Sequence, residues 1–212
     1  RVFPMSESGC AYIGFGAESA NEKTLTTMKK GGFILRNGMQ EINVDGTNHL
    51  FPKTMVDAVL NCHEAGIHAN CTWIMGYPGE VLEELKTSVA FIRWQQQIIE
   101  KNTVQNNCGY VDVKESINRK MFTATAYPGT DMFKDSHVKK ILNEEFKLTF
   151  DKHGEPECND AFHDYVLELD DATKVLKSKD GNYINYSQID NKTYMKARSL
   201  IEDNDTEGIL SL

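Results

Sequence analysis

Three short glycine-containing segments hold the residues best suited to ligand chemistry. They cover residues 14–19, 76–80 and 126–130, and each follows an apolar run and precedes a helical pattern. Glycine turns that open helices present free backbone N–H groups, which bind carboxylates and phosphates. Glycine also lets the backbone come close to a ligand, because it has no side chain. These segments, called the first, second and third tips below, therefore predict one shared ligand site.

Strands and helices alternate around the tips. The apolar runs predict buried strands over residues 12–16, 69–75 and 121–126, and the helical patterns predict helices over about 21–30, 52–65, 81–99 and 131–146. Pro52 and Gly66 suit the start and the stop of the second helix. Such alternation indicates parallel strands joined by crossovers, and ligands bind at the C-terminal ends of parallel strands. We therefore expect an α/β fold in which the tips share one edge.

The rest of the chain departs from this plan. Residues 33–50 and 101–117 look like inserted loops, the second with a short strand over 110–113. Residues 165–169 alternate as a strand does, residues 179–182 suit a hairpin turn, and a last helix is expected over 192–202.

Composition and charge exclude several classes of protein. Of the 212 residues, 40% are hydrophobic and 25% charged, which is ordinary for a globular protein. No apolar run reaches the length of about 18 residues that predicts a transmembrane helix. The formal net charge of −8 argues against a nucleic-acid partner. Residues 131–212 carry 11 basic and 18 acidic side chains, against 12 and 13 in residues 1–130, so the acidity belongs to the C-terminal part.

The cysteines indicate the cellular compartment of the protein, and the first residue indicates whether the chain is a fragment. The five cysteines are odd in number and widely spread, which is typical of reduced thiols in a cytoplasmic protein. The chain begins with Arg1 and shows no signal peptide, so we expect a fragment of a longer cytoplasmic protein.

The tips and their surroundings resemble a known family. Residues 9–19, residues 64–80 and residues 126–130 look like the fourth, fifth and sixth strands of radical S-adenosylmethionine (radical SAM) proteins. The resemblance covers roughly residues 9–135 and is closest to the branch often associated with cobalamin. It implies that residues 1–147 are the C-terminal half of a partial (β/α)6 TIM-like barrel with parallel strands. Residues 148–212 would be a small acidic α+β appendage of unknown role.

The family's chemistry needs groups that this sequence lacks. Its members hold a 4Fe-4S cluster through a Cys-x3-Cys-x2-Cys loop and cleave S-adenosylmethionine reductively to a 5′-deoxyadenosyl radical. A reductant such as ferredoxin or flavodoxin supplies the electron, the substrate is a small molecule or a peptide, and some members use cobalamin. The cysteine loop is absent here. The resemblance thus implies a radical SAM oxidoreductase or methyltransferase that is inactive without the missing N-terminal half of its barrel.

The resemblance also assigns roles to residues of the tips. Glu18 and Ser19 would contact the amino-acid or ribose part of S-adenosylmethionine, and Lys30 would reach its carboxylate. The wall near the adenine would be shaped by Gly76, Pro78 and Gly79. Further cofactor-binding positions on the same rim would be Gly14, Gly16 and Tyr127.

Plainer interpretations of these residues stay open. Glu18 could cap the helix that starts near Asn21, and Glu80 suits a helix cap more than chemistry. The Pro-Gly turns could be ordinary loop turns with no role in ligand binding. A zinc site among Cys62, His63, His68 and Cys71 is disfavoured because their spacing fits no short zinc motif, so we predict no metal ligands in this chain.

Two other functions remain as alternatives. The chain could be a non-catalytic half-barrel that acts as a binding or interaction module, with an open sheet edge that needs a partner. It could also belong to an ordinary barrel enzyme without iron.

Overall fold

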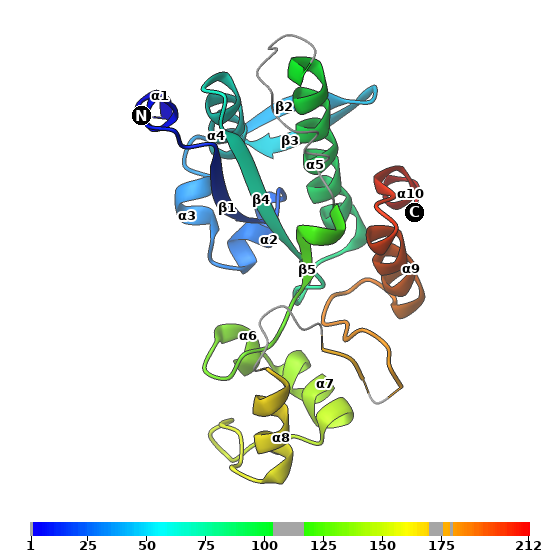
Figure 1. Ribbon diagram of the computed structural model, residues 1–212. Helices are drawn as coiled ribbons and strands as arrows, with labels where there is room; N and C mark the ends of the chain where they lie inside the picture. The colour runs from blue at the N-terminus through cyan, green and yellow to red at the C-terminus, as the bar shows by residue number, and fades with distance from the viewer. Residues whose placement is uncertain (1, 104–116, 170–175, 179) are drawn as a thin grey trace.

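A three-stranded parallel sheet forms the centre of the protein. The computed structural model describes residues 2–103, 117–169, 176–178 and 180–212 (Figure 1). Strands β1 (Tyr12–Glu18), β4 (His68–Met75) and β5 (Met121–Thr123) lie in the order β1-β4-β5. The register pairs Tyr12 with His68 and Trp73 with Met121, both in parallel. The predicted α/β class with parallel strands is confirmed. The described strands do not close into a barrel, and the partial barrel stays a prediction.

Helices cover one face of this sheet. Helix α4 (Lys53–Glu64) leads into β4, and α5 (Leu82–Thr103) follows it. Alternate residues of β4 from Ala69 to Met75 are buried in one hydrophobic cluster with both helices. Trp73 meets Phe91 of α5 with ring centroids 5.2 Å apart. The opposite face is open, since Gly14 and Gly16 of β1 are exposed there.

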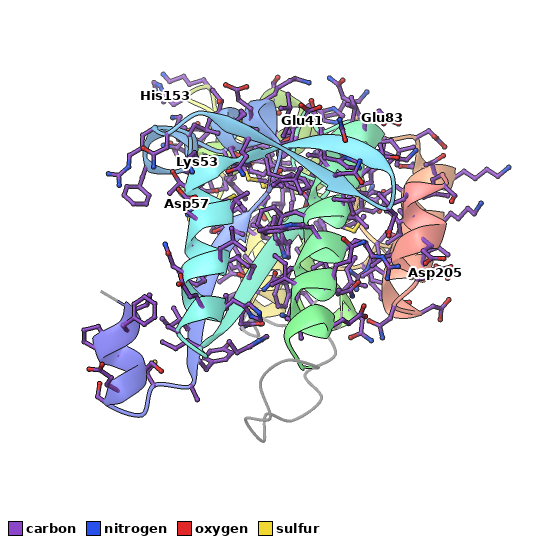
Figure 2. The ribbon with its side chains drawn as sticks, turned by 90° about the horizontal axis from the view of Figure 1, so that it is seen from above. Glu41, Lys53, Asp57, Glu83, His153 and Asp205 are labelled. Carbon is purple, nitrogen blue, oxygen red and sulfur yellow. The ribbon has the colours of Figure 1, made fainter. Side chains whose placement is uncertain are left out.

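The outer surface carries charged side chains. Seen from above, Lys53 and Asp57 project from the outer side of α4 (Figure 2), where their Nζ and Oδ1 atoms are 2.8 Å apart. An exposed i,i+4 pair of this kind adds little stability. In the part of the chain that the structure describes, no helix combines the length and apolar character needed to cross a membrane.

The segment between the first two βα units is a hairpin and not the loop expected over residues 33–50. Strands β2 (Met39–Val44) and β3 (Thr47–Pro52) pair antiparallel. Asp45 and Gly46 turn the chain with φ angles of 50° and 88°. Asp-Gly favours this two-residue turn because both positions need a positive φ.

Two predicted helices are interrupted. The helix expected over 21–30 is α2 (Glu22–Thr27), followed by the single turn α3 (Gly31–Ile34). The helix expected over 131–146 is split into α6 (Asp131–Lys134) and α7 (Ser136–Phe146). Asp135 causes the second break, because its extended backbone and side-chain oxygen cap α7.

The C-terminal part is mainly helical. Helix α8 (Asp160–Glu168) occupies the region where alternation predicted a strand over 165–169, so that prediction is wrong. The expected hairpin turn is marked by an isolated antiparallel bridge between Lys177 and Tyr183 and by a hydrogen bond from the Ser178 N–H to the Asn182 carbonyl. The last predicted helix is present as α9 (Asn191–Glu202), and α10 (Thr206–Leu210) follows. The short helix α1 (Val2–Glu7) precedes β1, and a 3-10 turn (Ile117–Arg119) precedes β5. The strand expected over 110–113 falls outside the described residues.

Two hydrophobic clusters hold the molecule together. The first packs the sheet with α4, α5, α9 and α10, and includes Tyr194, Ala197 and Ile201. The second packs the third tip with α6, α7 and α8, and includes Ala126, Phe133 and Tyr165. Both clusters contain residues from either side of position 147. The division of roles at that position stays a prediction.

Candidate functional site

The three tips leave the sheet at one edge. Strand β1 ends at Glu18, β4 at Met75 and β5 at Thr123. Because the pairing is parallel, with Glu18 opposite Trp73 and Met75 opposite Thr123, these ends are neighbours. The expected convergence of the tips on a common edge is present in the structure.

Glu18 turns its carboxylate back over the first tip. A bulge after Gly16 shifts the register, and Glu18 has a left-handed φ of 63°. A Cβ atom on Gly16 would be 3.1 Å from Oε1 of Glu18, so the missing side chain makes room for the carboxylate. Nζ of Lys30 is 3.4 Å from the same oxygen. The structure thus brings together Gly16, Glu18 and Lys30, with Gly14 on the same exposed face.

Ser19 faces the protein interior. Its side chain is fully buried, its Oγ is 3.2 Å from Oγ of Ser88 on α5, and it accepts a hydrogen bond from the Asn21 N–H. The cap of α2 is Asn21, whose Oδ1 accepts from Lys23 and Thr24 N–H groups. Glu18 therefore does not cap that helix. Ser19 joins the first tip to α5 and is not grouped with Glu18 and Lys30.

The second tip closes on a buried carboxyl group. Gly76 and Gly79 have φ angles of 81° and 85°, and the half-buried Pro78 lies between them. Oε2 of Glu80 accepts a hydrogen bond from the Gly76 N–H at 2.6 Å. Burial raises the pKa of the Glu80 carboxyl group to about 8, and the nearby Glu84 adds to this rise. The role of Glu80 is thus to close the tip.

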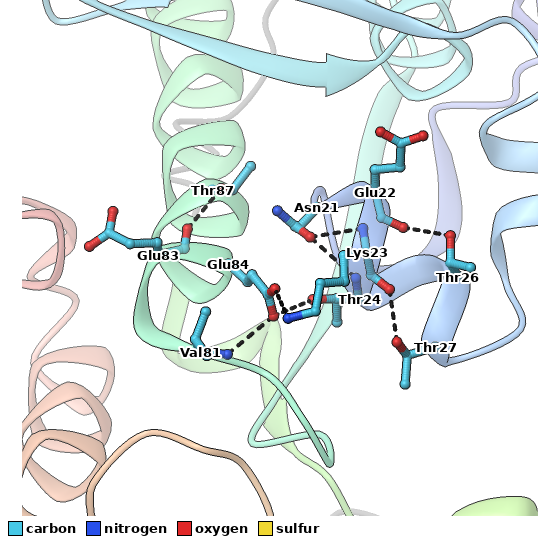
Figure 3. A network of polar contacts seen from close by, with 10 residues as sticks. All are labelled: Asn21, Glu22, Lys23, Thr24, Thr26, Thr27, Val81, Glu83, Glu84 and Thr87. Carbon is cyan, nitrogen blue, oxygen red and sulfur yellow. Dashed lines mark hydrogen bonds and ion pairs between the residues drawn. The ribbon is translucent and has the colours of Figure 1, made fainter.

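The cap of α5 is Glu84, a residue that sequence reasoning missed. Its Oε2 accepts from the Val81 N–H at 3.1 Å and from the Thr24 hydroxyl at 3.2 Å, while Oε1 pairs with Nζ of Lys23 at 2.6 Å (Figure 3). Glutamate three residues into a helix often bonds back to the first N–H groups. The network ties α2 to α5, and so the first tip to the second.

The third tip is exposed at Tyr127. Thr130 caps α6 by accepting from the Phe133 N–H, and its hydroxyl donates to the Tyr127 carbonyl. The Tyr165 hydroxyl donates to the Ala126 carbonyl at 2.6 Å. Tyr127 therefore stands on a fixed backbone with its ring partly open to solvent.

A cavity of about 280 Å³ lies between the end of α2, the second tip and the third tip. Its walls include Met28, Ile74, Tyr77, Ala124 and Thr125. An ion pair between Nζ of Lys29 and Oδ2 of Asp131, 2.6 Å apart, links its two sides. The consecutive lysines 29 and 30 thus reach the third and the first tip. No local pattern predicts the pairing of Lys29 with Asp131, because the two residues are distant along the chain.

The cysteines do not form a metal centre in the described part of the chain. There, no three His, Cys, Asp or Glu side chains gather as metal ligands would. Cys10, Cys62, Cys71 and Cys158 are free, and Cys108 lies outside the described residues. Burial raises the pKa of the Cys71 thiol to about 12 and lowers that of His68 to about 4.

Comparison with known proteins gives a distant similarity. No protein-family profile matches the chain. A protein described as an uncharacterized methyltransferase of Pyrococcus horikoshii is 27% identical over 139 residues, which cover 65% of this chain and 22% of that protein. The chain thus spans little more than a fifth of this relative and is similar to a methyltransferase.

Proposed function

We propose that this chain carries the S-adenosylmethionine-binding rim of a radical SAM enzyme, with methyl transfer as its reaction. The observation that carries the proposal is the Gly16–Glu18–Lys30 group at the C-terminal ends of the parallel strands, together with a cavity that Lys29, Ile74 and Tyr77 line near the same ends. The distant similarity to a methyltransferase supports the reaction class. The resemblance of the three tips to radical SAM strands supports the cofactor.

The residues of the rim fit the charged part of S-adenosylmethionine. The Glu18 carboxylate is still partly exposed and can accept hydrogen bonds from an ammonium group or from ribose hydroxyls. The half-exposed Lys30 supplies a cation that can pair with the cofactor's carboxylate. Gly14 and Gly16 add no side chains of their own to this face, on which the Tyr12 ring and the Glu18 carboxylate lie.

The cavity fits the adenine. Small-molecule pockets start at about 300 Å³, so a cavity of about 280 Å³ suits one part of a ligand. Its apolar wall of Met28 and Ile74, with the ring of Tyr77, suits a flat aromatic base. The second tip would shape this wall through its glycines, and the exposed Tyr127 would border it.

The cluster would come from an upstream half of the parent protein. When bound, the cluster and one external electron supply the cleavage of the sulfonium bond that gives the 5′-deoxyadenosyl radical. The residues of this chain would bind and orient the cofactor beside it. Cobalamin and the substrate would likewise be held outside the described rim.

Binding and turnover test the proposal separately. S-adenosylmethionine and S-adenosylhomocysteine are titrated calorimetrically into the full chain, and Glu18→Gln is compared with Glu22→Gln, an exposed carboxylate on α2. We expect Glu18→Gln alone to weaken binding by about tenfold, because it removes a charged acceptor. In the complete parent, with the cluster reconstituted anaerobically, we expect 5′-deoxyadenosine. Equal binding by both variants would remove Glu18 from the site.

The open sheet face favours a second candidate, a non-catalytic interaction module. Among the described strands, β1 pairs only with β4, and the open face carries the exposed rings of Tyr12 and Phe122. Exposed apolar groups beside an unpaired strand edge favour a protein partner. A full parent that binds neither S-adenosylmethionine nor its product would support this candidate.

A further inference from the structure

Glu80 is a buried acid beneath the second tip. Its side chain is 2% exposed, and Oε2 accepts from the Gly76 N–H at 2.6 Å. Oε1 has no hydrogen-bond partner among the described residues. A buried carboxylate with one bare oxygen is unfavourable when charged, so the neutral form is preferred in this position.

The same residue connects the tip to the C-terminal part of the chain. The Glu80 N–H donates to the Tyr77 carbonyl, and the Glu80 carbonyl accepts from the Gln188 N–H at 2.8 Å. Gly76 lies against the buried ring of Tyr194 in α9. The Glu80 backbone thus links the tip to the segment before α9, and the Glu80 side chain holds the tip itself through Gly76.

The charged and titratable groups around Glu80 do not offset its charge. Glu84 lies one turn along α5, and its carboxylate disfavours ionisation of Glu80. Glu84 is itself paired with Lys23. From α9, the Tyr194 hydroxyl donates to the Ile184 carbonyl, and Arg198 donates to the Met121 carbonyl. Among the described residues no cation is placed to pair with Glu80.

We propose that Glu80 is a proton-dependent latch of the second tip. Its neutral carboxyl group stays buried and holds the tip closed against α9. When the proton is lost to solvent, the carboxylate gains hydration by leaving the interior, and the hydrogen bond to Gly76 is lost with it. The consequence for ligand binding rests on the proposed function, because the second tip forms one wall of that site.

The latch has a defined pH window. In the closed form burial raises the pKa of Glu80 to about 8, whereas a hydrated glutamate titrates at about 4.5. Between these values the open form is ionised and the closed form is protonated. Each pH unit therefore favours opening by about tenfold, and the effect levels off near pH 8, where both forms are charged.

Amide hydrogen exchange of the full chain tests the latch. Exchange of the peptide that contains residues 76–80 is followed from pH 5 to pH 9, and each rate is divided by the rate of an unfolded peptide at that pH. We expect the corrected rate to rise by up to about tenfold per unit and to level off near pH 8. In Glu80→Gln, a neutral side chain of the same shape, the profile should be flat.

Matched controls make the result specific. Glu83→Gln changes an exposed carboxylate in the first turn of α5, three residues after Glu80, and should keep the original profile. The peptide of α4 should show no such slope, because opening of the tip leaves α4 packed. A flat profile in the unaltered chain, or an equal slope in Glu80→Gln, would overturn the proposal. The unaltered chain decides this even if Glu80→Gln does not fold.

Adding S-adenosylhomocysteine separates the latch from the proposed function. If that function holds, the ligand should slow exchange of residues 76–80 in both the unaltered chain and Glu80→Gln. Absence of this protection would contradict the proposed function, while the pH profile would still decide the latch.

Discussion

The position of the Glu18 carboxylate depends on the glycine at position 16. The carboxylate lies where a side chain on residue 16 would be. Glu18 holds a left-handed backbone conformation, which costs a non-glycine residue about 1 kcal/mol. Such strain is often kept where a side chain must be aimed at a ligand. The single lysine partner at 3.4 Å leaves the carboxylate with room for further donors.

Gly16→Ala should therefore affect binding more than folding. The new Cβ atom would be 3.1 Å from Oε1 of Glu18, and the flexible carboxylate would be displaced. We expect S-adenosylhomocysteine affinity to fall by about tenfold with little change in Tm, since a charge-assisted contact is lost. Calorimetric titration and thermal unfolding measure the two effects.

Gly14→Ala is the matched control for this substitution. It lies on the same exposed face, but its Cβ atom would meet only the Tyr12 ring at 3.8 Å, an ordinary contact. Equal losses of affinity in both variants would show that the placement of Glu18 is not the cause.

At the scale of elements, α9 supports the second tip through one close contact. A Cβ atom on Gly76 would be 2.7 Å from the Tyr194 hydroxyl oxygen, and that ring is fully buried and cannot withdraw. We expect Gly76→Ala to lower the free energy of unfolding by about 2–4 kcal/mol, from backbone strain and overpacking together. Urea denaturation measures this loss.

A double-mutant cycle isolates the contact. Gly79 has a φ similar to that of Gly76, and a Cβ atom added there would have no atom within 4 Å. Gly79→Ala should therefore cost about 1 kcal/mol of unfolding free energy through backbone strain alone. Tyr194→Phe removes the hydroxyl that blocks the Gly76 position, and combining it with Gly76→Ala should recover about 1 kcal/mol or more relative to additivity. Additive effects would place the cost of Gly76→Ala in its backbone alone.

The capping network makes a second prediction at this scale. Glu84 is buried and receives three donors from two elements, so Glu84→Ala leaves the Val81 N–H and the Thr24 hydroxyl without an acceptor. We expect a loss of about 2–3 kcal/mol in unfolding free energy. Glu83→Ala, at the exposed neighbouring position, should change it by less than about 0.5 kcal/mol. Similar losses in both variants would contradict the assignment of the cap.

Elements with local signals could be predicted from the sequence, and contacts between distant segments could not. Pro52 and Gly66 mark the ends of α4 to within one or two residues, because the helix start and stop depend on these residues alone. The hairpin also carries a local signal, Asp45-Gly46, which the prediction of a loop over residues 33–50 did not use. Helix α8 was missed because five alternating residues are too short to decide the period.

The candidate site likewise has features that the sequence pattern predicts and contacts that only the folded structure shows. The common edge of the tips follows from the alternation of strands and helices, which fixes the direction of every strand. The burial of Ser19 depends on Ser88, and the closure of the second tip depends on Tyr194. Neither partner is near in sequence, so only the folded structure pairs them.

For the whole molecule, the buried titratable groups should set how stability varies with pH. Burial lowers the pKa of His68 to about 4, with Lys120 nearby, and it also lowers those of His49 and His63. As pH falls below about 6.5, histidines in the unfolded chain take up protons that these partly buried histidines cannot, so the folded state loses stability. Burial lowers the pKa of Lys120 to about 8. Burial of this amine therefore destabilises the folded state increasingly as pH falls toward 8, and the loss of stability is constant well below that pH. The buried thiols and tyrosines act only above about pH 9.

Between pH 6.5 and pH 8, Glu80 is the described buried group that makes stability fall as pH rises, whereas Lys120 and the histidines act weakly in the opposite direction. There the unfolded chain has released the Glu80 proton, while burial keeps the folded-state pKa at about 8, so the folded state binds more protons and loses stability as pH rises. Over this interval we expect Glu80 to lower the free energy of unfolding of the unaltered chain by about 1.5 kcal/mol relative to Glu80→Gln, at up to about 1.4 kcal/mol per pH unit. Denaturant unfolding at several pH values should show this fall relative to Glu80→Gln in the unaltered chain and in Glu83→Gln, while Glu80→Gln itself should lose no stability as pH rises. Because the histidines oppose Glu80 below pH 6.5, Glu80→Gln should there gain stability with rising pH. A fall that persists in Glu80→Gln would mean that another group carries the proton.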